Sequence, residues 1–360
     1  MAGSRTELFN LAEDPDEEQD LSVREGPRLE RMRATLRVAL SKMAPGGDSA
    51  RTAAIAPDQE AILRSLGYVS GSGGKGELDE EHLPDPRDRV HLYERLEVLQ
   101  RPQTITLGQA LVEAVAIQED DPGNPFASQT VASLAYRTGR LGLSARAYRR
   151  ALELDPDRPS IRQSFGKLLR ELGRLDESEK ELRLAVEQTD ADDRRTRASL
   201  VATLVLRGKT EEAGRLVDDL TAKDPRSLDV LQARGRWLIA LGRVEEAGSL
   251  LTAAAMGPDA DPIVELAVAW LGKGDAARAQ AAAEAALARV PGQPWAQGVL
   301  GHALVLQGRR DDGLAVLRRA VAARPKRPQA WMSLAAGFDA AHDGASAEAC
   351  RRALEELLSP

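Results

Sequence analysis

The sequence predicts an all-α fold, a right-handed α-solenoid of stacked helical hairpins, and three observations lead to this prediction. A glycine recurs every 32 to 35 residues, small residues keep fixed distances from it, and a proline or an aspartate follows it at a constant distance. Self-similarity with such a period is the signature of repeat architectures. The recurring glycines are Gly139, Gly173, Gly208, Gly242, Gly274 and Gly308.

The spacing within each unit indicates two antiparallel helices. Glycine supplies the tight turn between them, and small residues let the two backbones approach. The Pro or Asp that follows stops the second helix. Because one hairpin cannot bury its own apolar face, consecutive units must stack. Six units are expected to begin near residues 125, 159, 194, 228, 260 and 294, and a seventh, less regular unit near residue 327.

Composition favours the same fold and excludes several functions. Aromatic residues are only 3% of the chain, so the core must be built from Ala, Leu and Val, which suits closely packed helices. The net charge of -7 argues against nucleic acid as the partner. The single cysteine, Cys350, and four scattered histidines offer no metal-ligand spacing. We therefore expect no cofactor, no metal and no catalytic residue.

The first 124 residues predict a different organisation. Residues 6–11 alternate and could form a short strand, and residues 27–43 and 57–69 have the pattern of helices. Residues 71–86 are Gly-rich and then acidic, which is typical of a flexible linker. Residues 87–124 are expected to form a degenerate hairpin that caps the stack, and residues 125–360 about seven repeat units.

No apolar stretch long enough to span a membrane occurs, and the first residues lack the apolar core of a signal peptide. As written, the chain is expected to be cytoplasmic.

The period near 34 residues, the small residues at three fixed offsets and the terminal proline resemble the tetratricopeptide repeat. Two departures are Arg234, which occupies a normally apolar position, and the unit near residue 260, which is about two residues short. The resemblance implies a non-catalytic scaffold that binds a protein or peptide partner in the concave groove of the solenoid.

A second resemblance concerns the N-terminal segment TELFNLAEDPDEEQDLS. It is similar to the C-terminal end of a sulfatase-like hydrolase fused to tetratricopeptide repeats, through Leu8, Phe9, Leu11, Asp14, Pro15 and Glu17. The Cys/Ser-x-Pro-x-Arg motif of that family is absent, since Cys350 is followed by Arg-Arg-Ala.

This second resemblance implies an alternative reading. The chain would be the C-terminal fragment of such a hydrolase, periplasmic or extracellular, and would associate with a separate sulfatase-like domain. A further alternative is a structural role in which exposed end units stack between copies of the chain.

The repeat register places the first helix of each hairpin on the concave face. Lys167, Arg170 and Arg236 there are expected to hold carboxylates of the peptide, although ordinary solvated side chains are the alternative. Trp237 and Trp270 are expected to pack in the core, whereas Trp295 and Trp331 could equally be binding anchors. The expected groove residues are Gln129, Tyr136, Arg137, Gln163, Lys167, Arg170, Gln232, Arg236, Trp295, His302 and Trp331.

Overall fold

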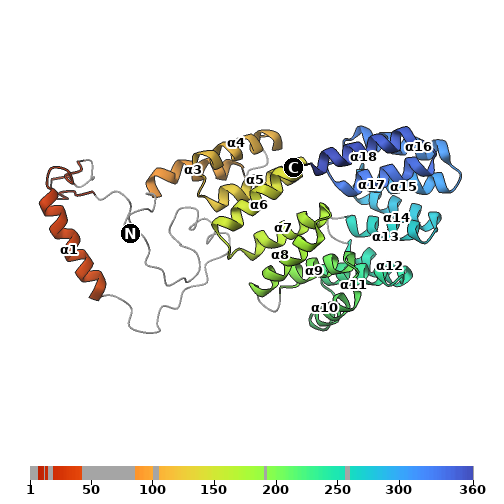
Figure 1. Ribbon diagram of the computed structural model, residues 1–360, viewed down its shortest axis with the longest axis horizontal. Coiled ribbons are helices and arrows are strands. Elements are labelled where there is room, and N and C mark those ends of the chain that lie inside the picture. Colours follow the sequence, from red (N-terminus) through yellow and green to blue (C-terminus); the bar gives the residue numbers. More distant parts are fainter. Residues whose placement is uncertain are drawn as a thin grey trace. The chain divides into compact units, whose positions relative to one another are not determined.

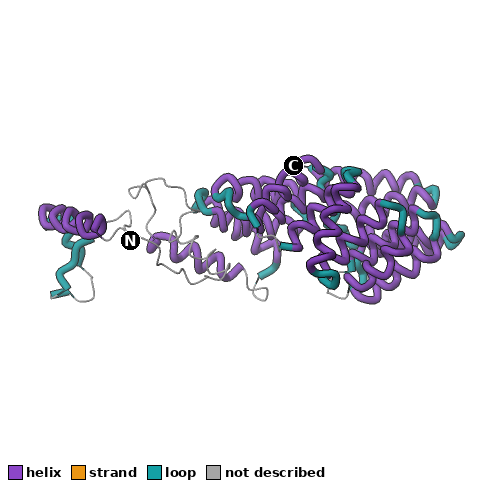
Figure 2. Tube along the Cα trace, turned by 90° about the horizontal axis from the view of Figure 1, so that it is seen from below, coloured by secondary structure: helices purple, strands orange, loops and turns teal. Residues whose placement is uncertain are grey.

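A computed structural model describes residues 7–11, 13–14, 19–42, 86–99, 105–189, 193–255 and 260–359. These residues form α-helices and turns and contain no strand (Figure 2), which confirms the all-α prediction. The chain divides into two compact units, Met1–Arg101 and Pro102–Pro360.

The first unit contains α1 (Gly26–Lys42) and α3 (Pro86–Leu99). α1 confirms the helix predicted at residues 27–43. The strand predicted at residues 6–11 is wrong for its described part, residues 7–11. There the Leu8 amide donates to Asp20 Oδ1 at 3.0 Å, and the Leu8 carbonyl accepts from the Leu21 amide at 2.7 Å. These bonds close a loop and leave no ladder partner for a strand.

Two other expectations for this region are not tested. The helix expected at residues 57–69 lies outside the described residues, as does the linker at 71–86 apart from Pro86, which begins α3. The capping hairpin at residues 87–124 stays a prediction, because α3 and the helix that follows it belong to different units.

The second unit is a series of helical hairpins (Figure 1), preceded by one helix, α4. Its helices are α4 (Leu107–Asp120), α5 (Pro125–Thr138), α6 (Leu141–Leu154), α7 (Pro159–Glu171), α8 (Leu175–Glu187), α9 (Arg194–Leu206), α10 (Thr210–Lys223), α11 (Leu228–Ala240), α12 (Val244–Ala254), α13 (Asp261–Gly272), α14 (Ala276–Arg289), α15 (Pro294–Leu306), α16 (Arg310–Ala322), α17 (Pro328–Ala340) and α18 (Gly344–Leu358).

The predicted turn glycines lie at the corners between paired helices. All six have φ between +73° and +82°, a region that L side chains avoid, so the predicted role of glycine is confirmed. At the first corner, the Gly139 amide donates to the Tyr136 carbonyl at 3.0 Å and the Arg140 amide to the Ala135 carbonyl at 2.8 Å. These bonds satisfy the last carbonyls of α5 and start α6 in the opposite direction.

Small residues inside the hairpins allow the close approach of the paired helices. A Cβ atom added to Gly166 would lie 2.6 Å from Leu182 Cγ, and one added to Gly235 would lie 2.6 Å from Leu251 Cγ. Ser178 contributes at the same interface, because its buried hydroxyl donates to the Gly166 carbonyl at 2.7 Å. Each glycine thus provides the space that a leucine of the facing helix fills.

Each second helix packs against the first helix of the next hairpin, and α7, α9, α11, α13, α15 and α17 also contact one another in this order. Apolar core clusters lie between consecutive hairpins. Within this unit the end of the series also meets its beginning: α18 contacts α6, and a Cβ atom on Gly139 would lie 3.0 Å from Lys326 Cβ. The stacked first helices therefore face a shared space that is partly open to solvent.

We predict that Gly166→Ala lowers the free energy of unfolding of the second unit by about 1–3 kcal/mol, because the added methyl overlaps buried Leu182. The matched control is Gly108→Ala in α4, where a Cβ meets no atom within 4 Å. Its helix propensity should leave stability unchanged or raise it by up to ~1 kcal/mol. Urea unfolding of the full chain measures both, and equal destabilisation by the two variants would contradict the packing argument.

Candidate functional site

The second unit holds an open pocket of about 480 Å³ lined by its first helices. A volume of this size lies in the range of ligand pockets, ~300–1,000 Å³. The walls come from α7, α9, α11 and α13, and the beginnings of α15 and α17 complete them. The lining residues are Lys167, Arg170, Glu171, Arg195, Ala198, Ser199, Ala202, Val205, Leu206, Asp229, Gln232, Arg236, Ile239, Asp261, Glu265, Val268, Ala269, Trp295, Arg327 and Gln329.

One wall carries three cations, Lys167 and Arg170 from α7 and Arg195 from α9. Burial, followed by the charge of Arg236, lowers the pKa of Arg170 to about 10, so the guanidinium is still charged at neutral pH. Arg170 Nη1 donates to the Ser199 carbonyl at 3.3 Å. Burial also lowers the pKa of Lys167, followed by the charges of Arg170 and Arg195. These shifts show that Lys167 and Arg170 lie near other cations in a poorly solvated place, whereas Arg195 is exposed.

Arg236, on α11, is in a different state. Its Nε and Nη2 atoms donate to the two oxygens of Glu265 on α13, both at 2.8 Å. This bidentate pair holds neighbouring first helices together and neutralises the guanidinium. Arg236 was grouped with Lys167 and Arg170 in the sequence analysis as a carboxylate ligand, but a carboxylate of the chain already occupies its guanidinium fork.

Arg327 connects distant hairpins at one end of the cavity. It pairs with Asp261, the first residue of α13, and its Nη2 lies 3.6 Å from Glu171 Oε1 at the end of α7. Its guanidinium also lies 5.7 Å from the centre of the Trp295 ring. Tyr136 completes the group, since its hydroxyl donates to Glu171 Oε1 at 2.8 Å.

The pKa values of Arg327 and Tyr136 reflect these contacts. Burial opposes the charge of Arg327, but Asp261 and Glu171 outweigh it and raise the pKa of Arg327. Burial, together with the charge of Glu171, raises the pKa of Tyr136. Arg327 is therefore a cation fixed between two carboxylates. Because it directly precedes α17, its ion pairs join the start of α17 to α7 and α13.

Apolar side chains form the rest of the cavity surface. Val205 and Leu206 from α9, Ile239 from α11 and Val268 from α13 line it together with Trp295. Leu206 is 59% exposed and Val268 is 41% exposed. The cavity therefore presents cationic side chains together with exposed aliphatic side chains.

The structure brings five of the expected groove residues together at this cavity: Lys167, Arg170, Gln232, Arg236 and Trp295. The others lie elsewhere. Tyr136 reaches the cavity wall through Glu171, Gln129 accepts from Arg158 Nη2 at 3.1 Å, and Arg137 is exposed outside the lining.

The remaining three are packed inside the unit. Gln163 is buried in α7, His302 is half-buried and burial lowers its pKa, and Trp331 is buried with its Nε1 donating to the Pro325 carbonyl at 2.8 Å. Trp331 is thus a core residue held by a hydrogen bond. Sequence reasoning missed the lining residues Glu171, Arg195, Asp261, Glu265 and Arg327.

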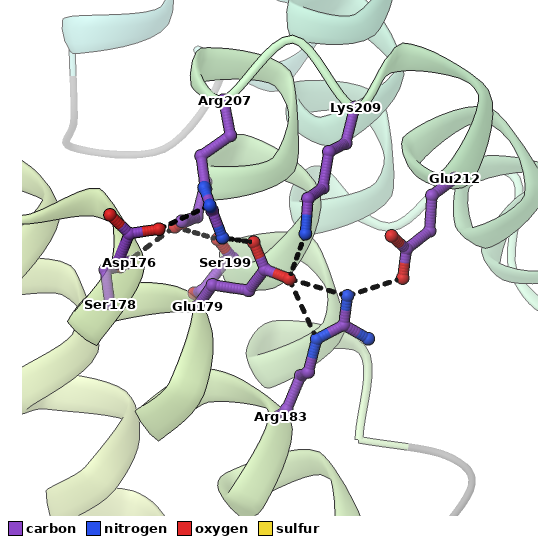
Figure 3. Close-up of polar contacts among 9 residues, drawn as sticks. Asp176, Ser178, Glu179, Arg183, Ser199, Arg207, Lys209 and Glu212 are labelled. Carbon is purple, nitrogen blue, oxygen red and sulfur yellow. Dashed lines mark hydrogen bonds and ion pairs between the residues drawn. The ribbon is translucent and has the colours of Figure 1, made fainter.

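A second polar cluster lies on α8, α9 and α10 and is structural (Figure 3). At its centre, buried Glu179 accepts from Lys209 Nζ at 2.7 Å, from Arg183 Nη2 at 2.7 Å and from Arg207. Burial raises the pKa of Glu179, but the three hydrogen bonds outweigh it and lower the value to about 2. Arg183 also donates to Glu212 at 2.7 Å, which extends the cluster to α10. The cluster joins two consecutive hairpins.

Glu179→Gln should lower the free energy of unfolding by about 2 kcal/mol at pH 7, because it leaves three cations without their central carboxylate. The folded-state pKa of Glu179 is depressed from the usual 4.5 to about 2. Its contribution is therefore complete above pH 4.5 and lost as the pH falls toward 2. Urea unfolding across this range should show the two proteins converging at low pH. Glu177→Gln, which removes an exposed pair with Arg174, is the control and should cost under ~1 kcal/mol.

Arg327→Ala should destabilise the second unit by about 2 kcal/mol, since it leaves the largely buried carboxylates of Glu171 and Asp261 without their shared cation. Chemical unfolding of the full chain measures the loss. Arg319→Ala removes an exposed arginine from α16 and should have little effect. Equal stability of the two variants would mean that Arg327 does not hold the hairpins together.

Other chemistry is limited in the described part of the chain. Cys350 is buried in the core between α17 and α18, and burial raises the pKa of its thiol, which keeps it unreactive. The described residues contain no group of three or more His, Cys, Asp or Glu side chains placed to hold a metal ion. Nor does any described helix combine the length and hydropathy needed to cross a membrane.

Comparison with known proteins agrees with this geometry. Two family models, both described as tetratricopeptide repeat, match residues 132–193 and 271–337. The crystal structure of a tetratricopeptide repeat protein from Parabacteroides merdae ATCC 43184 is similar, with a TM-score of 0.54 and 14% sequence identity. That alignment covers 70% of this chain and 99% of the other.

A structure of PilF from Pseudomonas aeruginosa aligns with a TM-score of 0.39 and 18% identity, covering 55% of this chain and 91% of the other. No curated protein sequence matches this chain significantly. Neither family match extends into residues 1–70, so the resemblance to sulfatase-like hydrolases rests on the motif alone. Residues 132–193 and 271–337 thus match tetratricopeptide-repeat models, and the helical hairpins between Pro125 and Leu358 share the fold of the Parabacteroides merdae protein.

Proposed function

We propose that this chain is a non-catalytic scaffold that binds a peptide segment of a partner protein in the cavity lined by its first helices. The observation that carries the proposal is the composition of the cavity walls. Two exposed aliphatic side chains, Leu206 and Val268, line the cavity beside charged groups. Exposed apolar side chains beside convergent polar groups mark binding surfaces.

The arrangement also supports a rigid binding site. The lining side chains come from helices whose backbones are fixed by neighbouring hairpins, and the pair Arg236–Glu265 connects two of these helices. A preformed site needs little ordering of the scaffold, so more of the interaction energy appears as affinity. A peptide with a hydrophobic side chain would cover Leu206 and Val268 and remove them from water.

The alternative from the sequence analysis is a C-terminal fragment that positions a separate sulfatase-like domain. In this alternative the partner is a sulfatase-like domain and not a peptide segment. That domain would bind at the same cavity or at another face of the chain. An in vitro association assay with such a domain, supplied as a separate chain, would decide between the two partners.

Val268→Trp tests the cavity as the binding site, because a larger side chain at this exposed lining position fills the space. Peptides are first selected from a random display library on the full chain and then measured by fluorescence anisotropy. We expect Val268→Trp to weaken their binding at least ~10-fold, since lost contacts of ~1.4 kcal/mol correspond to tenfold.

The control is Val112→Trp on α4, an exposed position that does not line the cavity. It should bind as the unmodified chain does, and both variants should unfold at unchanged urea concentrations. Failure to select any peptide, or equal affinities of the two variants, would contradict the proposal.

A further inference from the structure

The end of the second unit meets its beginning. α18 contacts α6, a Cβ atom on Gly139 would lie 3.0 Å from Lys326 Cβ, and Arg327 Nη2 lies 3.6 Å from Glu171 Oε1. We call this contact the closing interface; Gly139, Glu171 and α6 lie on one side of it, and Lys326, Arg327 and α18 on the other. Since consecutive first helices from α7 to α17 also touch, the closing interface completes a ring.

The two charged groups of the closing interface are held by different parts of the chain. On the C-terminal side, Arg327 pairs with Asp261, and its guanidinium lies 5.7 Å from the centre of the Trp295 ring. On the N-terminal side, the Tyr136 hydroxyl donates to Glu171 Oε1 at 2.8 Å. Each group therefore keeps a partner of its own when Arg327 and Glu171 separate.

The closing interface is packed less completely than the interior of the last two hairpins. The apolar cluster that contains Ala347 and Cys350 of α18 draws its members from α15 to α18. A second, smaller pocket of about 290 Å³ lies at the closing interface, and Gly142 and Ala145 of α6 line it together with Leu358 of α18. Separation of α18 from α6 would therefore leave this apolar cluster intact.

The hydrogen bonding of the closing interface is incomplete as well. Glu171 Oε2 and Arg327 Nε are buried and have no hydrogen-bond partner among the described residues. Buried polar atoms without a partner destabilise a fold, so they offset part of what the ion pair contributes. The closed ring therefore gains little net stability from this contact, and a form in which both groups are hydrated is close to it in free energy.

We propose that the second unit exchanges between a closed ring and an open form, and that the ion pair between Arg327 and Glu171 breaks when the ring opens. Small rotations at the interfaces between consecutive hairpins move the two ends apart, while the core clusters of those interfaces persist.

The cavity lined by the first helices changes with this motion. Glu171 lines it from α7, whereas Arg327 and Gln329 line it from the beginning of α17. Opening the ring moves these walls apart, and closing it brings them together. A ligand that touches both walls would favour the closed form, because it interacts less well with the open one. The exchange itself belongs to the scaffold and does not depend on the proposed peptide.

The test measures the distance across the closing interface by double electron–electron resonance on the full chain. Spin labels are attached to Arg140→Cys, at the start of α6, and to Glu356→Cys on α18, both exposed positions. A control pair, Lys180→Cys on α8 and Arg215→Cys on α10, lies on consecutive hairpins. All chains carry Cys350→Ala, so that only the introduced cysteines are labelled.

Glu171→Gln removes the charge on one side of the closing interface and keeps an oxygen that accepts from the Tyr136 hydroxyl. We expect it to add a longer distance across the interface and to raise the ratio of open to closed molecules at least ~5-fold. The matched variant Glu177→Gln, which removes the exposed pair with Arg174, should leave the distance unchanged.

Salt provides a second route to the open form without any change at Glu171. At ~1 M salt, where the Debye length is about 3 Å, the labelled chain should shift toward the longer distance, because the Arg327 side of the ion pair is partly exposed. The control pair should keep one distance throughout, and urea unfolding checks that each variant is folded.

Two results would overturn the exchange. One is an unchanged distance across the closing interface, either in folded Glu171→Gln or at ~1 M salt. The other is an equal change in Glu177→Gln or in the control pair, since the whole stack would then loosen. If Glu171→Gln does not fold, the salt series decides alone. None of these measurements uses a peptide, so failure of the proposed function is a separate result.

Discussion

The close approach of the two helices in each hairpin is the constraint on which the rest of the structure depends. Gly166 and Gly235 leave room for leucines of the facing helices, and without that room the two backbones would separate. The distance between paired helices determines how each hairpin packs against the next. It therefore also sets which side chains of the first helices converge on the cavity, since Gly166 and Gly235 directly precede the lining residues Lys167 and Arg236.

Charged groups in this unit differ in whether they form ion pairs with other groups of the chain. Glu179 forms ion pairs with three cations between consecutive hairpins. Arg327 lies between two carboxylates of distant hairpins. Such groups join elements of the chain, because removal of one member leaves others buried and unpaired. Burial lowers the pKa values of Lys167 and Arg170 as well, and the carboxylates that oppose this act only through their charge: Asp229 on Lys167, and Glu265 and Glu171 on Arg170.

The hairpins and their turns could be predicted from the sequence because both depend on local geometry. Glycines with positive φ, such as Gly139, and small residues at helix interfaces, such as Ser178, recur at fixed spacing in the sequence. Which cations pair with carboxylates of the chain could not be predicted in the same way. Arg236 finds its carboxylate 29 residues away on the next first helix, and Arg327 finds Asp261 66 residues away. Such pairs depend on how the hairpins stack, which the repeat pattern alone does not define.

The contact of Arg327 with Asp261 and Glu171 also bears on how a peptide enters the cavity. The group lies at the edge of the pocket and joins the beginning of α17 to α13 and α7. A peptide that passed through this edge would have to separate a cation from two largely buried carboxylates, which is costly. Entry past Leu206 and Val268 meets no such pair, because these side chains are exposed and apolar. A peptide bound as proposed would therefore reach the pocket past Leu206 and Val268, and covering these side chains would remove apolar surface from water.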